Sequence, residues 1–238
     1  LGESKKYGKE TLSILAIIPA RKGSKQLPKK NLAKLGGKSL VEIAINVAKD
    51  VKQINNILVS SDCKEIIKIA KKNNVLTSLR PKELASDNSL IIETIKYEYK
   101  RLKKHLNIDI LVLLEVTSPM RKSIHIEKCI NMLIKKKLDS VATFRESDIH
   151  PNKTWNINNN GIPMTFLKNS DPWTPRQELS KAYQLSGVAY VFKPNGIKKK
   201  SNSLLFGKQG GVIIDKKYSI DIDDSIDLEL AKILIQQK

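Results

Sequence analysis

The sequence has only two cysteines in 238 residues, Cys63 and Cys129, and they are too far apart to form a CxxC pair. This argues against a disulfide framework and a zinc site, so we expect reduced thiols in or near the core. The three histidines, His105, His125 and His150, are also dispersed, and none stands at metal-ligand spacing from another His or Cys. We therefore assign no chemistry to these five residues.

Long apolar runs are lacking as well. No run approaches the eighteen or so apolar residues of a membrane span, and the opening LGESKKYGKETL has no apolar core of the signal-peptide kind. We expect a cytoplasmic chain with no membrane partner, in which residues 1–11 form a flexible tail. A length of 238 residues suits one domain that carries an insertion.

Aromatic residues make up only 5% of the chain, too few for a platform on which nucleic-acid bases stack. The net charge of +19 nevertheless resembles the electrostatic footprint of a nucleic-acid-binding protein. Only six of the 43 cations are arginine, the side chain favoured for reading bases and for bidentate phosphate contacts. We expect no specific nucleic-acid partner, and a basic nucleic-acid-binding protein is the alternative from another functional class.

Short apolar segments alternate with segments of helical periodicity along most of the chain. The expected strands are 12–20, 57–59, 108–114 and 140–144, and the expected helices are 40–48, 64–73, 89–104 and 123–136. A capping box formed by Ser39 and Glu42 marks the start of the first helix. This alternation predicts a doubly wound α/β fold with a mostly parallel sheet. The most apolar strand, 108–114, is expected at its centre.

Residues 146–186 break this alternation with four prolines, an Asn-Asn-Asn-Gly turn and both tryptophans. We interpret them as an insertion built from hairpins, between a core at 12–145 and its return at 187–238. Trp155 and Trp173 either lie at a subunit interface, where aromatic side chains are enriched, or pack locally over the sheet. The returning core is expected to contain strands at 187–192 and 211–214, an extended segment at 218–224 and a helix at 225–236.

The loop after the first strand contains five cations and no acid: Arg21, Lys22, Lys25, Lys29 and Lys30. Ligands of open α/β sheets bind beyond the carboxyl ends of the strands, and so many like charges repel one another unless an anion joins them. The loop is therefore expected to bind a polyphosphate. It carries neither named phosphate motif, since a G-x-G-x-x-G is absent and a Walker A would need glycine at position 32.

Asp221-Ile222-Asp223 is the second candidate constellation. On a strand, residues two apart point to the same side, so both carboxylates can reach one cation while Ile220 and Ile222 face the core. Mg²⁺ suits this pair, because it takes one or two carboxylates and completes its shell with water and phosphate oxygens. The alternative is an acidic helix start, in which Asp223 and Asp224 interact favourably with the helix dipole.

Five motifs in this order resemble the N-acylneuraminate cytidylyltransferases, also called CMP-sialic acid synthetases. They are ARKGSKQLPKKN at 20–31, RPKELASD at 80–87, LLEVTSPMR at 113–121, PRQ at 175–177 and DID at 221–223. The resemblance implies that the anomeric hydroxyl of a nonulosonic acid attacks the α-phosphate of CTP, giving a CMP-sugar and pyrophosphate. It also implies a homodimer formed through the insertion.

The resemblance assigns roles to individual residues. The expected nucleotide-binding residues are Arg21, Gly23, Ser24, Lys25, Lys30, Asn31, Arg80 and Ser86. Asp221 and Asp223 are expected to bind Mg²⁺, and Arg21, Lys30 and Asp221 to take part in catalysis. The expected sugar-binding residues are Glu115, Thr117, Ser118, Lys153, Arg176, Gln177 and Gln184, with Lys153 and Arg176 reaching into the partner's site.

Two departures from the family bear on the sugar. Glu115 stands where the family usually has Gln, and an ionised carboxylate only accepts hydrogen bonds. Gln184 begins a Q-L-S-G stretch where relatives often have R-x-N-G. We therefore expect a relative of N-acetylneuraminate with other substituents, such as a legionaminate, a pseudaminate or an amino-bearing sugar. The alternatives are a Kdo cytidylyltransferase, a transferase for another nucleotide and an inactive scaffold.

Overall fold

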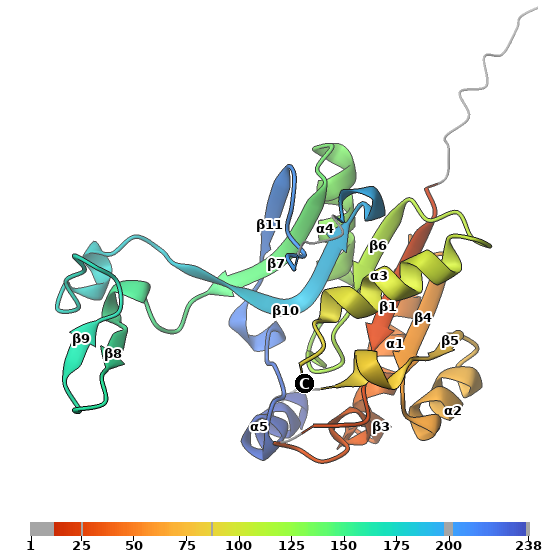
Figure 1. Ribbon diagram of the computed structural model, residues 1–238, viewed down its shortest axis with the longest axis horizontal. Coiled ribbons are helices and arrows are strands. Elements are labelled where there is room, and N and C mark those ends of the chain that lie inside the picture. Colours follow the sequence, from red (N-terminus) through yellow and green to blue (C-terminus); the bar gives the residue numbers. More distant parts are fainter. Residues whose placement is uncertain (1–11, 25, 87, 198–201, 237–238) are drawn as a thin grey trace, which may run out of the picture.

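The computed structural model describes residues 12–24, 26–86, 88–197 and 202–236. The expected flexible tail, the phosphate ligand Lys25 and the motif residue Asp87 lie outside the described residues. Within them, a seven-stranded sheet forms the centre of the molecule, in the order β11-β7-β10-β6-β1-β4-β5 (Figure 1). Its strands are β1 (Ile14–Pro19), β4 (Asn56–Ser61), β5 (Leu76–Leu79), β6 (Ile110–Leu113), β7 (Ser140–Glu146), β10 (Tyr183–Phe192) and β11 (Gln209–Ile213).

The predicted doubly wound, mostly parallel sheet is confirmed. Neighbouring strands are parallel except where β10 pairs antiparallel with β6 and β7. The most apolar strand, β6, is fourth of the seven and all four of its residues are buried, as a strand covered on both faces requires. Strand β5 was not predicted, because only one of its four residues is buried and its apolar signal is correspondingly weak.

Helices cover both faces of the sheet. The helices are α1 (Leu40–Asp50), α2 (Lys64–Lys72), α3 (Ile91–Leu102), α4 (Ser123–Lys135) and α5 (Ser225–Gln236). Side chains of α1, α2, α4 and α5 share one apolar cluster with the sheet, whereas α3 packs in the cluster on the opposite face. The predicted capping box is confirmed: the Glu42 N–H donates to Ser39 Oγ, and the Glu42 carboxylate accepts the Ser39 N–H.

The two predicted thiols are confirmed as buried free cysteines, Cys63 and Cys129. Cys129 is fully buried in α4, and burial raises the pKa of its thiol to about 12, so this side chain is inert packing. Among the described residues, no helix has the length and apolar character needed to cross a membrane.

Residues 147–182, here called the arm, leave the body between β7 and β10 (Figure 1). The arm contains the expected hairpin, formed by β8 (Trp155–Ile157) and β9 (Pro163–Thr165) around a turn closed by the Gly161 N–H and the Asn158 carbonyl. Trp155 and Trp173 lie edge to face, with ring centroids 6.4 Å apart, and both are exposed. The expectation that they pack over the sheet is therefore wrong, because the arm projects away from it.

The interpretation of residues 221–223 as part of a strand is also wrong. After a short 3-10 helix (η6, Lys216–Tyr218), the chain runs irregularly to Asp224 beyond the carboxyl edge of the sheet. There the Ile222 N–H bonds to the Thr117 carbonyl at 2.8 Å, but no described strand lies alongside to form a ladder. The predicted alternation survives: Ile222 is fully buried, whereas Asp221 and Asp223 on either side of it are exposed.

Candidate active site

A pocket of about 230 Å³, here called the switch-point pocket, lies beyond the carboxyl ends of β1 and β6. The chain passes from β1 to β4 and β5 on one side and returns to β6 on the other, so this is the point where the strand order reverses. Its walls include the predicted nucleotide-binding residues Arg21, Gly23, Ser24, Lys30, Asn31, Arg80 and Ser86, with Glu115 and Thr117. The described members of the expected nucleotide-binding set therefore converge on one pocket.

Two hydrogen bonds hold the loop after β1, one between its two ends and one to the end of β4. Asn31 Nδ2 donates to the Arg21 carbonyl at 2.7 Å, which closes the loop on itself. The Lys22 N–H donates to the Asp62 carboxylate at 2.7 Å, which ties the loop to the end of β4. The loop is thus shaped before any anion binds, so less conformational entropy is lost on binding.

Arg80 is a buried wall of the switch-point pocket. Its Nη1 donates to the Leu84 carbonyl and Thr94 Oγ1, and its Nη2 donates to the Ser60 carbonyl at 2.8 Å. Burial lowers the pKa of the guanidinium from its usual value. Three hydrogen bonds therefore hold the Arg80 side chain in the pocket wall. Its Nε has no acceptor among the described residues, so this N–H can still donate to a ligand.

A second pocket of about 360 Å³, here called the Gly187 pocket, adjoins the first, and Glu115 lines both. Gly187 lies where the pairing of β10 with β7 shifts register, and its φ of +70° is one that few side chains tolerate. A Cβ at this position would lie 3.1 Å from Ser118 Oγ and 3.2 Å from Glu115 Oε2. Glycine is therefore needed both for the bulge and for the space above it.

Glu115 is the least typical ionisable group of the site. Burial, reinforced by the nearby Asp221 carboxylate, raises the pKa of Glu115 to about 7. Below it lies Arg121, whose side chain donates to the carbonyls of Ser118 and Glu115 and which is itself buried. Burial lowers the pKa of Arg121 to about 10, although the two carboxylates partly offset this. No role was predicted for Arg121 from the sequence, although it is the last residue of the motif at 113–121.

The predicted metal pair lies where the two pockets meet. Asp221 lines the Gly187 pocket, and Asp223 forms an ion pair with Lys30, with Nζ 3.0 Å from Oδ1. Lys30 and Asp223 are 193 residues apart in the sequence. No group of three or more His, Cys, Asp or Glu among the described residues is arranged to hold a metal. Two carboxylates suffice for Mg²⁺ when phosphate and water supply the other ligands. The Lys30 ammonium that pairs with Asp223 shows that this position attracts a cation.

The expected sugar-binding residues lie in three places: the Gly187 pocket, the switch-point pocket and the arm. Glu115 and Gln184 line the Gly187 pocket, and Ser118 lies buried beneath it with a hydroxyl that has no partner among the described residues. Thr117 instead lines the switch-point pocket.

Lys153, Arg176 and Gln177 lie on the arm of the same chain. Lys153 Nζ donates to the Pro172 and Thr174 carbonyls, and Arg176 donates to the Asp148 carbonyl at 3.3 Å. None of the three is among the described residues that line these two pockets.

Arg145 and Lys216 are further cations of the Gly187 pocket that sequence reasoning missed. Both bind the Asp148 carboxylate, Arg145 at 2.8 Å, and they hold the pKa of that carboxyl below its usual value. Arg145 stands directly opposite Gln184 in the β7–β10 ladder. A sequence pattern gives no signal for this pairing, because it depends on the register of two strands about forty residues apart.

The model of the cytidylyltransferase family matches residues 15–162 of this chain. The chain is 28% identical over 229 residues to the post-translational flagellin modification protein B of Campylobacter coli, covering 94% of this chain and 96% of that protein. It is 33% identical over 238 residues to an N-acylneuraminate cytidylyltransferase of Escherichia coli, covering 94% of this chain and 52% of that protein. The chain thus spans nearly all of the first relative but only about half of the second.

Among solved structures, a CMP:2-keto-3-deoxy-manno-octonic acid synthetase complexed with CTP resembles this chain with a TM-score of 0.68. The match covers 94% of this chain and 99% of that one at 16% sequence identity. At an identity this low, the likeness shows a shared fold and nothing about function.

Proposed function

The chain belongs to the cytidylyltransferase family, and on this premise we propose that it activates a nonulosonic acid with CTP, giving a CMP-sugar and pyrophosphate. One observation carries the proposal: the ion pair between Lys30 and Asp223 joins the basic loop to the carboxylate pair at the place where two pockets share Glu115. A phosphate site, a cation site and room for an acceptor therefore adjoin one another. The relative from Escherichia coli is named an N-acylneuraminate cytidylyltransferase, which agrees with this reaction.

CTP fits the switch-point pocket. Arg21 and Lys30 supply charge for the triphosphate, and Asn31 holds the loop that presents the N–H groups of Gly23 and Ser24. The nucleoside lies toward Arg80 and Ser86 on the other side of the pocket. The α-phosphate then lies near Glu115, facing the second pocket.

Asp221 and Asp223 are the residues that would hold Mg²⁺ in this proposal. When bound there, the ion neutralises phosphate charge and lowers the pKa of an attacking hydroxyl. Lys30 takes over part of the neutralisation, since its ammonium already lies 3.0 Å from Asp223. Ile222 keeps the two carboxylates on one side, because its buried side chain and its N–H bond to Thr117 fix the backbone between them.

The acceptor sugar occupies the Gly187 pocket. Its anomeric hydroxyl attacks the α-phosphorus and loses its proton to solvent, the new P–O bond forms, and the bond to the β-phosphate breaks to release pyrophosphate. Arg21 and Lys30 stabilise the charge that develops on the leaving group, which is the main catalytic contribution available to this site. Little covalent chemistry is required of the protein, so positioning dominates.

Glu115 is the residue we propose to discriminate between sugars. It faces the acceptor from a half-buried position, and in the carboxylate form, which predominates above its pKa of about 7, it accepts hydrogen bonds that an amide in the same place would partly donate. A sugar that presents a donor such as an amine or amide N–H therefore fits better than one that presents an acceptor. If Glu115→Gln leaves the preference between N-acetylneuraminate, legionaminate and pseudaminate unchanged, this role is wrong.

The arm is proposed to form a homodimer that places Arg176 and Lys153 in the partner's acceptor pocket, with Gln177 beside Arg176. Arg suits this task, because its guanidinium can bind a sugar carboxylate in a bidentate manner. Mixing Asp221→Ala with Arg176→Ala subunits provides a test. The mixture should recover about a quarter of the wild-type rate, because half of the randomly re-formed dimers are mixed and each contains one complete site. Arg176 acting within its own subunit predicts no recovery.

The decisive experiment measures Mg²⁺-dependent pyrophosphate release from CTP with N-acetylneuraminate, legionaminate, pseudaminate and Kdo. Release with one nonulosonate supports the reaction, and release with Kdo alone favours the Kdo alternative. If all four sugars fail with CTP, ATP, GTP and UTP, the chain is not this enzyme. Steeply salt-dependent DNA or RNA binding that persists in Asp221→Ala would then favour the nucleic-acid-binding alternative.

A further inference from the structure

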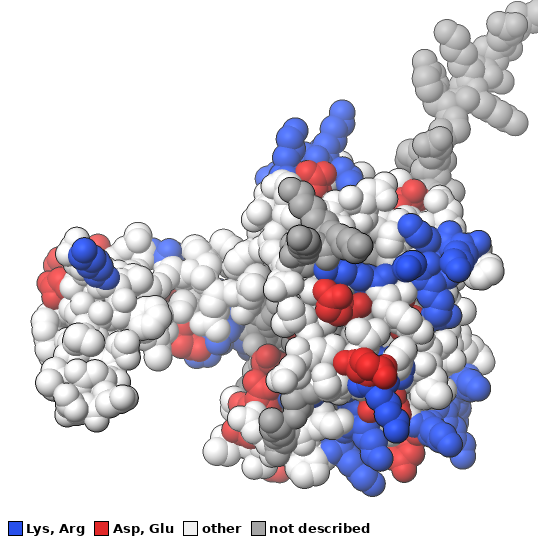
Figure 2. Space-filling view, in the orientation of Figure 1, with Lys and Arg blue, Asp and Glu red and all other residues white. Residues whose placement is uncertain are grey.

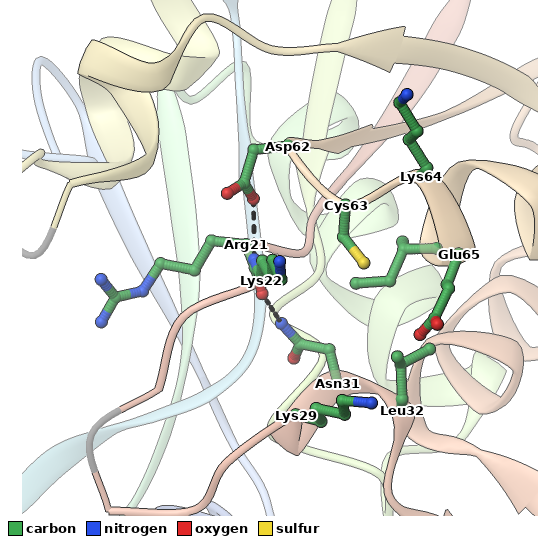
Figure 3. A pocket seen from close by; sticks show the side chains of 10 residues that line it. Arg21, Lys22, Lys29, Asn31, Leu32, Asp62, Cys63, Lys64 and Glu65 are labelled. Atoms are coloured by element: carbon green, nitrogen blue, oxygen red, sulfur yellow. Dashed lines mark hydrogen bonds between the residues drawn. The ribbon is translucent and has the colours of Figure 1, made fainter.

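The basic loop has a second face. A cavity of about 410 Å³, here called the Lys29 cavity, lies between this loop and the start of α2 (Figure 3). Arg21 and the side chains of Lys22, Lys29 and Lys64 line it, together with Asp62 and an apolar floor that includes Ile66. Lys22 and Lys29 line this cavity and do not line the switch-point pocket. The loop cations are thus divided between two sites.

Lysines outnumber carboxylates among the described residues of the Lys29 cavity. Lys22, Lys29 and Lys64 line it together with Asp62 and Glu65, and Asp62 already accepts the Lys22 N–H at 2.7 Å. No ion pair between described residues involves Lys22, Lys29 or Lys64. Like charges that converge on a concave surface raise the local concentration of anions.

The backbone holds one of these cations in an uncommon conformation. Lys29 has a φ of +56°, in the left-handed region that a non-glycine residue adopts only at an energetic cost. Its side chain extends toward Leu32 in Figure 3, whereas Arg21 extends to the opposite side. The strain therefore accompanies a lysine that faces the cavity.

The cavity adjoins the switch-point pocket, because an open pocket of about 530 Å³ is lined by Lys22 and Lys29 together with Gly23, Ser24 and Ser86. Arg21 and Asn31 line both, and the 2.7 Å hydrogen bond from Asn31 Nδ2 to the Arg21 carbonyl crosses the loop between them (Figure 3). An occupant of one side therefore acts on the residues that line the other. Two anions on either side of one loop also repel each other.

From these observations we propose that the Lys29 cavity binds a phosphate-class anion, and that this anion weakens the binding of nucleotide in the switch-point pocket. Inorganic phosphate and pyrophosphate share the required chemistry. If pyrophosphate occupies the cavity, nucleotide binding responds to the concentration of the reaction product. If inorganic phosphate occupies it, nucleotide binding responds to the phosphate concentration of the cell. The inference concerns anion binding and does not require that the acceptor be a nonulosonic acid.

The test is calorimetric titration of the full chain with inorganic phosphate and, separately, with pyrophosphate, without sugar. Each titration is repeated with increasing CTP. We expect saturable binding whose dissociation constant rises severalfold and then levels off once CTP saturates, since the two sites are distinct. A constant that rises without limit means that phosphate and CTP compete for one pocket, which overturns the proposal.

Lys64→Gln and Lys68→Gln form a matched pair for this test. Both lysines are exposed on α2 one turn apart, but only Lys64 lines the Lys29 cavity, and neither lines the switch-point pocket. Lys64→Gln should weaken phosphate binding about tenfold, as expected for loss of a charged hydrogen-bond donor, while Lys68→Gln should not. Equal behaviour of the two variants, or no saturable binding, contradicts the proposal. If CTP fails to bind while phosphate binding still depends on Lys64, the proposed function and the coupling to nucleotide both fail, and only the anion site in the Lys29 cavity stands.

Discussion

The body and the arm use apolar side chains in opposite ways. In the body, the residues of β1 and β6 are almost all buried, and helices of the same chain cover them. On the arm, Ile157 and Phe166 are each 66% exposed and Trp173 is 83% exposed. The face of the arm seen in Figure 2 is also largely uncharged, whereas Lys and Arg gather on the body. The body therefore buries most of its apolar side chains within the chain, whereas the arm exposes an apolar surface of the kind that marks protein–protein interaction sites.

This difference separates two tasks. The body contains both pockets, the basic loop and the carboxylate pair, so it positions the chemistry. Of the described residues of the arm, only Asp148, two residues beyond the end of β7, lines either pocket in its own chain. Damage to the body should therefore affect folding or turnover, and damage to the arm should first affect association.

The largest effect is expected from Asp221→Ala. Loss of one carboxylate of the proposed metal pair should lower kcat about 10³-fold or more, a size typical for removing a group that stabilises transition-state charge. The fold and the oligomeric state should not change, because Asp221 is exposed. Pyrophosphate release and sedimentation measure the two properties. Asp50→Asn, an exposed carboxylate at the end of α1, is the control, and equal activity of the two variants contradicts the assignment.

Ile17→Ala and Ile157→Ala compare the same substitution in a strand of each region. Ile17 is 1% exposed in β1, so its truncation should lower the free energy of unfolding by about 2–5 kcal/mol. Ile157 on the arm should cost about 0.5 kcal/mol or less in dilute protein. Denaturant unfolding at two protein concentrations checks this. A large cost for Ile157 at every concentration would mean that the arm is part of the core.

Trp173→Ser combined with Phe166→Ser should weaken the proposed dimer by about 2 kcal/mol or more, since large apolar side chains dominate the energy of interfaces. Analytical ultracentrifugation should then find the variant as a monomer at concentrations where we expect the wild type to be a dimer. Ile213→Thr, which changes an equally exposed apolar residue on β11 of the body, should not alter association. Dissociation caused by Ile213→Thr alone would move the interface to the sheet edge.

The smallest effect concerns Glu115 and pH. The folded-state pKa of about 7 exceeds the usual 4.5, so the folded protein binds more protons than the unfolded chain between these values. The free energy of unfolding should therefore fall as pH rises from 4.5 to 7, by about 1 kcal/mol per pH unit at most. Glu115→Gln should remove this loss. Denaturation of both proteins at several pH values, without metal or CTP, measures it, and parallel curves would show that Glu115 titrates normally.

Local patterns were sufficient for most of the fold. Strand β6 was predicted from an unbroken apolar run, and the start of α1 from the Ser39 and Glu42 capping box, because burial and capping act on neighbouring residues. The sheet edge that carries the site also followed, since parallel strands bring their carboxyl ends together. The failure at 221–223 has the same origin: alternation was correctly predicted, but a strand also needs a neighbour.

By itself, the sequence determined the residue types of the site, their order and the alternation that builds the sheet. Only the tertiary structure decided which of them meet. It placed Lys30 on Asp223, put Glu115 between two pockets, set Arg145 opposite Gln184 and turned Lys22 and Lys29 to the far side of the loop. The physical reason is that periodicity and turn chemistry are local, whereas charge pairing and pocket walls depend on strand register and on contacts between segments far apart in the chain.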